Sequence, residues 1–192
     1  MRTLLISTIA LLANTVLVSS SRSAPFETLA DARIRHVMSG FVFPTQVGVF
    51  QRGQTHEYNQ AGSDVSVGYN TDVPVPIVAT VYVYPAPNQD SADVLTSEYA
   101  AKRAEVLHMH QTAAILSEGP ATIFQAGKKY VGKQGYFSYR DVFAGTPQNL
   151  KSQLLVFRDG PLFIEYRFTY ARDQAEQAEK EIEHFIRQWS WR

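Results

Sequence analysis

The stretch from residue 150 to residue 189 constrains the fold more than any other part of the chain. Two strand-like runs, 150–157 and 162–170, flank the turn segment 158–161, which contains the pair Asp159-Gly160. Such a pair supplies the positive-φ positions that a tight hairpin turn requires. Along the second run, apolar residues alternate with Glu165, Arg167 and Thr169. The stretch therefore begins with a predicted two-stranded hairpin that buries one face.

A helix is predicted directly after this hairpin. Its apolar residues recur at helical spacing and form one narrow stripe, as expected for a helix that packs on a sheet. The stripe consists of Ala175, Ala178, Ile182, Phe185 and Trp189.

The earlier part of the chain predicts further strands and one more helix. Alternating patterns cover 65–69 and 77–84, and more strands are predicted between residues 121 and 143. A long central helix is expected from an N-cap at Asp90 or Ser91 to about Ser117, ended by Gly119-Pro120. The predicted fold class is α+β: a largely antiparallel sheet of roughly six to eight strands, covered by the long central helix and the C-terminal helix.

Two segments before residue 60 are less regular. Residues 25–39 fit one or two helical turns or a loosely held lead into the fold. Residues 46–58 fit one long strand, in which Gly48 or Gly53 marks a bulge.

Residues 1–24 are predicted to be a cleavable secretory signal peptide. Arg2 forms a short basic region, an apolar run follows to Val18, and small residues fill 19–24. The run of about 15 residues contains Asn14 and Thr15 and is short for a membrane span. We therefore expect a periplasmic or secreted protein without a transmembrane anchor in the mature chain, folded as a single globular domain over residues 25–192.

The composition argues against several classes of partner and site. Removal of residues 1–24 deletes Arg2 and Arg22 and leaves 16 basic against 18 acidic side chains, a formal charge of −2. This balance gives no long-range attraction to nucleic acid. The chain has no cysteine, which excludes disulfides and thiolate metal ligands. His108 and His110 are two apart on a predicted helix and cannot grip one metal ion together. No metal or cofactor is expected.

Tyrosine is the unusual feature, with ten residues. Tyrosine combines a large apolar ring with a polar tip, which suits ligand-binding walls and protein interfaces. It is also a good strand former, so the same residues would serve to fill a half-wet sheet face. Strand ends near residues 64–84 are the predicted place for a polar-aromatic ligand site, formed by Asp64, Tyr69, Asn70, Tyr82 and Tyr84.

A basic segment is the second candidate binding surface. Residues 127–133 match the spacing of a phosphate-binding loop, but Gln134 stands where Ser or Thr would bind magnesium, and a strand pattern follows in place of a helix. The segment is better explained as a basic β-hairpin in which Lys128, Lys129 and Lys133 protect an exposed edge.

A catalytic alternative stays open. Ser66, in a loose match to a nucleophile elbow, would need Asp64, His56 or Glu57 nearby for general acid–base work. An envelope-acting hydrolase with a site near Asp64, Ser66 and His56 is therefore the alternative function.

The order of elements resembles the PsbP-like class of exported domains. The residues that carry this resemblance are the strand 163–170 and the helix 175–189. The resemblance implies an antiparallel sheet sandwiched by helices and a non-catalytic accessory role, and it transfers no functional residue. We therefore expect an exported, non-catalytic domain that binds an envelope protein or a small ligand.

Overall fold

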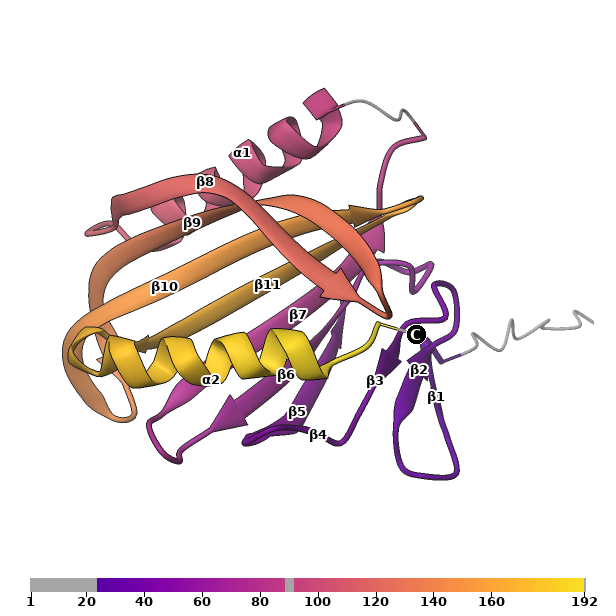
Figure 1. Cartoon of the computed structure of the whole chain (residues 1–192), viewed down its shortest axis with the longest axis horizontal. Helices are drawn as coiled ribbons and strands as arrows, with labels where there is room; N and C mark the ends of the chain where they lie inside the picture. Colours follow the sequence, from indigo (N-terminus) through magenta and orange to yellow (C-terminus); the bar gives the residue numbers. More distant parts are fainter. Residues whose placement is uncertain (1–23, 89–91, 192) are drawn as a thin grey trace, which may run out of the picture.

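The computed structural model describes residues 24–88 and 92–191 and has an α+β architecture (Figure 1). Eight antiparallel strands form the main sheet, in the order β4-β5-β6-β7-β11-β10-β9-β8. Its strands are β4 (Gln46–Val47), β5 (Phe50–Glu57), β6 (Val65–Thr71), β7 (Ile77–Pro85), β8 (Ala114–Gln125), β9 (Lys128–Phe143), β10 (Thr146–Asp159) and β11 (Leu162–Ala171). The antiparallel sheet and its number of strands agree with the prediction.

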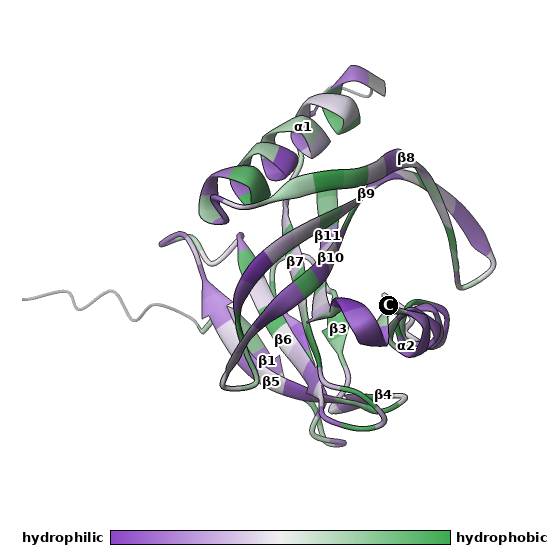
Figure 2. Cartoon of the chain, turned by 90° about the vertical axis from the view of Figure 1, so that its left-hand side faces the viewer, coloured by the Kyte–Doolittle hydropathy of each residue, from purple (hydrophilic) through white to green (hydrophobic). Residues whose placement is uncertain are grey.

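The two helices lie on opposite faces of this sheet. Helix α1 (Ala92–Met109) precedes β8, and helix α2 (Ala175–Gln188) follows β11 after a short 3₁₀ turn, Arg172–Gln174. Figure 2 shows α2 end-on inside the curl of the sheet, with α1 outside it. Each face therefore has its own helix and its own environment.

The predicted hairpin is formed by β10 and β11, with one difference at the turn. Asp159 pairs with Leu162, so the two-residue loop is Gly160-Pro161. Only Gly160 has a positive φ, 59°, which suits the first central position of a type II′ turn. Asp159 instead belongs to β10, where it is buried and accepts hydrogen bonds from Lys128 and Tyr130.

The main core lies between the sheet and α2, as the apolar stripe predicts. Ala178, Ile182 and Phe185 are the buried residues of the helix, and Trp189 is buried just after it. Phe185 packs edge-on against Phe168 and Phe50, with ring centroids 5.6 and 4.8 Å apart. The inward-facing residues of β11 belong to the same core cluster; they are Leu162, Ile164, Tyr166, Phe168 and Tyr170.

The central helix is shorter than predicted. It has 18 residues and ends at Met109, and β8 begins at Ala114. Gly119 and Pro120 lie inside β8 and do not end the helix. Because β8 is an edge strand, it tolerates a residue without an N–H, and its pairing with β9 overrides the local helical preference. The predicted caps, Asp90 and Ser91, lie outside the described residues.

The N-terminal part also differs from prediction. Residues 25–39 form no helix: β1 (Phe26–Thr28), β2 (Ile34–His36) and β3 (Val42–Phe43) make a small second sheet. The predicted strand 46–58 is divided into β4 and β5 at Gly48, whose φ is 56°, and it carries an irregularity between Arg52 and Thr55.

Neither helix in the described part of the chain is long and apolar enough to cross a membrane. The predicted signal peptide, residues 1–24, lies outside the described residues except for Ala24.

Candidate functional site

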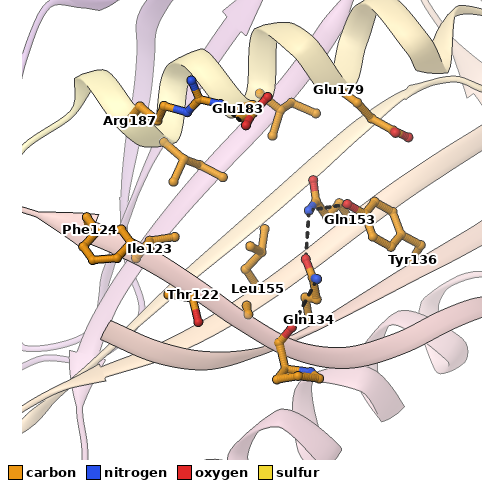
Figure 3. A pocket seen from close by; sticks show the side chains of 14 residues that line it. Thr122, Ile123, Phe124, Gln134, Tyr136, Gln153, Leu155, Glu179, Glu183 and Arg187 are labelled. Atoms are coloured by element: carbon orange, nitrogen blue, oxygen red, sulfur yellow. Dashed lines mark hydrogen bonds and ion pairs between the residues drawn. The ribbon is translucent and has the colours of Figure 1, made fainter. Parts of the chain in front are cut away.

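An open groove of about 610 Å³, here called the α2 groove, lies between α2 and strands β8, β9 and β10 (Figure 3). Its apolar part is formed by inward-facing residues of the sheet and by one side of α2. These residues are Ala121, Ile123, Leu155, Ile182 and Ile186. The α2 groove is therefore a continuation of the core that the sheet leaves open.

Strand β8 closes one end of the α2 groove. The buried side chain of Gln125 donates from Nε2 to the backbone oxygen of Ile186 over 3.0 Å. This bond ties the end of β8 to α2, and the groove opens between the two elements beside it. The groove thus results from β8 and β9 curling toward α2 without packing on it along their full length.

A chain of polar side chains crosses the groove floor. Gln134 donates from Nε2 to the oxygen of Pro120 over 3.3 Å. Gln153 donates from Nε2 to Gln134 Oε1 over 3.4 Å and to the hydroxyl of Tyr136 over 2.8 Å. Figure 3 shows this chain beneath α2, with the amide oxygen of Gln153 on the side of the helix. A few polar groups inside a mostly apolar cavity are the usual composition of a small-molecule site.

The charged side chains of the groove wall are already paired. Glu179 accepts from Lys151 over 2.5 Å and from the Tyr170 hydroxyl over 2.9 Å. Glu183 pairs with Arg187 one helical turn later on α2. The α2 groove therefore offers an incoming ligand no unpaired charge among its described lining residues.

A second, smaller cavity of about 370 Å³ lies on the other face of the sheet, beside α1. It is called the α1-face pocket, and three of the five predicted ligand residues line it: Asp64, Tyr82 and Tyr84. They come together because Ser66, two residues after Asp64, pairs with Tyr82 across β6 and β7. Sequence reasoning missed the charged residues that share the pocket, which are Lys102, Glu105, Glu165 and Arg167.

These charged residues form one network. Arg167 bridges the buried carboxylate of Glu165 and, over 2.6 Å, the carboxylate of Glu105. Glu165 also accepts from the Tyr84 hydroxyl over 3.1 Å. Burial raises the pKa of Glu165, and the adjacent Arg167 opposes that rise. Lys102 lies over the Tyr84 ring and pairs with Glu105.

Asp64 stands apart from this network. Its carboxylate makes no hydrogen bond or ion pair with other residues of the described ranges. Burial raises its pKa, while the charge of Lys102 opposes the rise. Burial also raises the pKa of the neighbouring Tyr82 to about 12. The pocket therefore combines a half-buried carboxylate with aromatic rings, two of which already carry a cation on one face: Arg167 lies over Tyr82 and Lys102 over Tyr84.

The other two predicted ligand residues lie elsewhere. Tyr69 is completely buried in the main core on the α2 side, where its hydroxyl donates to the oxygen of Pro44 over 2.8 Å. Asn70 is exposed and lines a shallow depression near Val49 and Val73. Alternation along β6 places Tyr69 on the face opposite Asn70, so the five residues do not form one site.

The basic segment is not at an unpaired edge. Lys133 pairs with Val156 on one side and with Pro120 on the other, because β9 lies between β10 and β8. Lys128 lies at the hairpin tip, 3.2 Å from Asp159 and over the Tyr130 ring. The edge strand is β8. Pro120, which has no N–H, limits the pairing of this edge with another chain, the role that was predicted for the lysines.

The residues of the catalytic alternative share one face of the sheet. His56 pairs with Ser66 across β5 and β6, and Asp64 lies two residues before Ser66. The Ser66 hydroxyl is nevertheless completely buried and hydrogen-bonded to Tyr58 over 3.0 Å. A nucleophile must reach its substrate, and this hydroxyl does not. The described residues also contain no group of three or more His, Asp or Glu arranged to hold a metal ion.

Sequence reasoning did not identify the α2 groove, although one signal for it was present. Gln153 shares its strand face with Leu155 and Phe157, which belong to the main core. A polar residue in an apolar inward-facing row needs a buried partner, or a ligand, to satisfy it. The residue pattern alone does not say whether Gln153 has a partner within the protein or needs a ligand, because the answer depends on the path of β8 and β9.

No protein-family model matches this chain, and no curated protein sequence matches it. Among solved structures, it is similar to a protein of unknown function from Pseudomonas aeruginosa, with a TM-score of 0.45 and 11% identity over 87% of this chain and 96% of that one. It is also similar to cyanobacterial PsbP (CyanoP) from Synechocystis, with a TM-score of 0.46 and 12% identity over 89% of this chain and 94% of that one. The chain thus has a weak PsbP-like resemblance, which concerns architecture alone.

Proposed function

We propose that this chain is a non-catalytic binding domain of the cell envelope that holds a small ligand in the α2 groove. The observation that carries the proposal is the groove itself: a cavity of about 610 Å³ with an apolar floor and a short row of amide and hydroxyl groups. This volume and this composition are those of ordinary small-molecule sites. Export through residues 1–24 would place the domain in the periplasm or outside the cell.

The α1-face pocket is less suited to be the main site. Its described charged groups, apart from Asp64, satisfy one another, so a ligand would have to compete with existing ion pairs. Asp64, Tyr82 and Tyr84 are proposed as a secondary contact surface for an envelope partner. The α2 groove, by contrast, is open without the loss of any contact.

A fragment screen by NMR on the chain from residue 25 onward tests the proposal. We expect binders to shift the backbone amide resonances of β8, β10 and α2. In the variant Ala121→Phe, the new ring occupies the groove floor and should remove this binding. Ala104→Phe, at an exposed position on α1, is the matched control and should leave binding unchanged.

Thermal unfolding of both variants shows whether they remain folded. If fragments bind equally well to wild-type protein and to folded Ala121→Phe, the α2 groove is not the ligand site. A screen in which no compound shifts the groove resonances would contradict the proposal as well.

A further inference from the structure

We propose that the α2 groove recognises an uncharged ligand in which a secondary amide adjoins an apolar chain. This inference rests on the proposed function and adds the chemical class of the ligand. The residues that would read the amide are Gln153 on β10 and Tyr136 on β9, which are direct partners across the two strands.

The orientation of the glutamine amides follows from one backbone atom. The oxygen of Pro120 can only accept a hydrogen bond, so Gln134 must turn its Nε2 toward it. The Oε1 of Gln134 then faces Gln153, which must present its own Nε2 in return. The same Nε2 also donates to the Tyr136 hydroxyl. The oxygen of Pro120 orients Gln134, and Gln134 in turn orients Gln153. This leaves Oε1 as the side-chain atom of Gln153 that has no hydrogen-bond partner among the described residues.

Two hydrogen-bonding positions remain open. In the described structure, Gln153 Oε1 accepts no hydrogen bond and the Tyr136 hydroxyl donates none. Gln153 is only 6% exposed, and its amide oxygen lies on the side of α2, above the groove floor (Figure 3). This oxygen faces the open groove and has no partner within the described part of the chain, so it can accept a hydrogen bond from a ligand donor that replaces water there.

A secondary amide matches this pair of positions. Its N–H would donate to Gln153 Oε1, and its carbonyl oxygen would accept from the Tyr136 hydroxyl. An ester of the same shape offers only the acceptor and leaves Gln153 unsatisfied. Recognition of one donor and one acceptor side by side discriminates against an analogue that lacks one of them.

The other residues that line the groove favour a ligand with an apolar chain and no charge. Leu155, Ile182 and Ile186 continue the floor beyond the amide row and favour an apolar chain. The wall carboxylates of Glu179 and Glu183 are paired with Lys151 and Arg187. A charged ligand would lose hydration without gaining a free counter-charge, so the ligand should be uncharged.

The test compares two probes that differ only in the donor: N-hexylacetamide and hexyl acetate. Binding to the chain from residue 25 onward is measured by NMR titration of groove resonances. We expect the amide to bind about tenfold more tightly, which corresponds to one net hydrogen bond. Gln153→Leu should abolish this preference, and Tyr136→Phe should weaken amide binding. Gln54→Leu, at an exposed position on β5, should leave both affinities unchanged.

The outcomes separate the inference from the proposed function. If both probes bind in the groove with equal affinity, amide recognition is refuted while ligand binding stands. If neither probe shifts the groove resonances although screened fragments do, the ligand class is again refuted. Because the two probes are compared on wild-type protein, the result does not depend on whether Gln153→Leu folds.

Discussion

The hydroxyl of Tyr99 in α1 occupies the space above Gly135 in β9 that a Cβ atom would need. The same hydroxyl donates to Glu118 on β8 over 2.7 Å. Gly135 is therefore a close-approach position, where the absence of a side chain lets α1 contact the sheet. Its conformation requires no positive φ, so the constraint is steric and comes from the neighbouring helix.

Replacement of this glycine should destabilise the protein. We expect Gly135→Ala to lower the free energy of unfolding by about 1–3 kcal/mol, the usual cost of overpacking. Urea denaturation measures the change. Gly119→Ala is the matched control, because a Cβ there meets no atom within 4 Å. Adding Tyr99→Phe to Gly135→Ala should recover part of the loss, and equal destabilisation by both glycine variants would contradict the steric explanation.

The core under α2 should respond to cavity formation. Phe185→Ala and Ile164→Ala each remove a completely buried side chain and should cost about 2–5 kcal/mol. Val131→Ala, on the exposed side of β9, should change the denaturation midpoint little. Unchanged midpoints for the two core variants would show that this core is assigned wrongly.

The buried carboxylate of Glu165 should matter more than the exposed one that shares its partner. Glu165→Gln leaves the guanidinium of Arg167 without its buried counter-charge and should cost about 3 kcal/mol. Glu105→Gln removes the half-exposed partner of Arg167 and should cost less than about 1 kcal/mol. Chemical denaturation at neutral pH compares them, and the reverse order would refute the assigned roles.

Asp64 should make stability depend on pH. Burial raises the pKa of its carboxyl above the ordinary 3.8, so the folded protein holds this proton more tightly than the unfolded chain. Its contribution is present below the ordinary pKa and is lost as pH rises through the folded pKa. The stability of Asp64→Asn, measured relative to wild type, should therefore increase as the pH rises from about 3 to about 7.

Urea denaturation of both proteins at the two pH values measures this difference. A variant whose stability relative to wild type is the same at both values would contradict the raised pKa. The prediction concerns the secondary contact surface alone, because Asp64 lies across the sheet from the α2 groove.

If residues 1–24 are a cleavable signal peptide, the exported protein should lack them. Expression of the full sequence in a Gram-negative bacterium should yield a periplasmic product that begins within residues 21–25, since small residues surround the cleavage zone. Mass spectrometry of the purified protein identifies its first residue. Replacing Leu11 and Leu12 by Asp should block processing by interrupting the apolar run, and an unprocessed wild-type chain would refute the signal peptide.

Local pattern was sufficient for some elements and insufficient for others. The alternation in 162–170 and the helical stripe in 175–189 correctly assigned β11, α2 and the face of each that forms the core. The end of α1 was wrong, because residues 114–117 pair with β9, and no local pattern reveals a partner so distant in sequence. The N-terminal hairpin of β1 and β2 was missed for another reason: its strands have three residues each, too few to show an alternating pattern.

The candidate site residues show the same difference between local pattern and tertiary structure. Tyr82 and Tyr84, which were both predicted to belong to the ligand site, do share one face of β7, and the period of two in a strand is a local property. Tyr69 was misplaced because its ring belongs to the opposite face of β6, where it is buried among Phe185 and Trp189. Alternation tells which residues share a face, and it does not tell which face is covered by a helix.

By itself, the sequence determined the α+β class, the antiparallel hairpin and the helix that covers it, because these depend on periodicity and turn chemistry within about forty residues. Only the tertiary structure decided that β8 and β9 curl toward α2 and leave a groove, and that Pro120 orients Gln134 and Gln153 within it. A cavity arises where packing between distant segments stops. Residue patterns record which side chains are apolar, but the space they leave open depends on the path of the whole sheet.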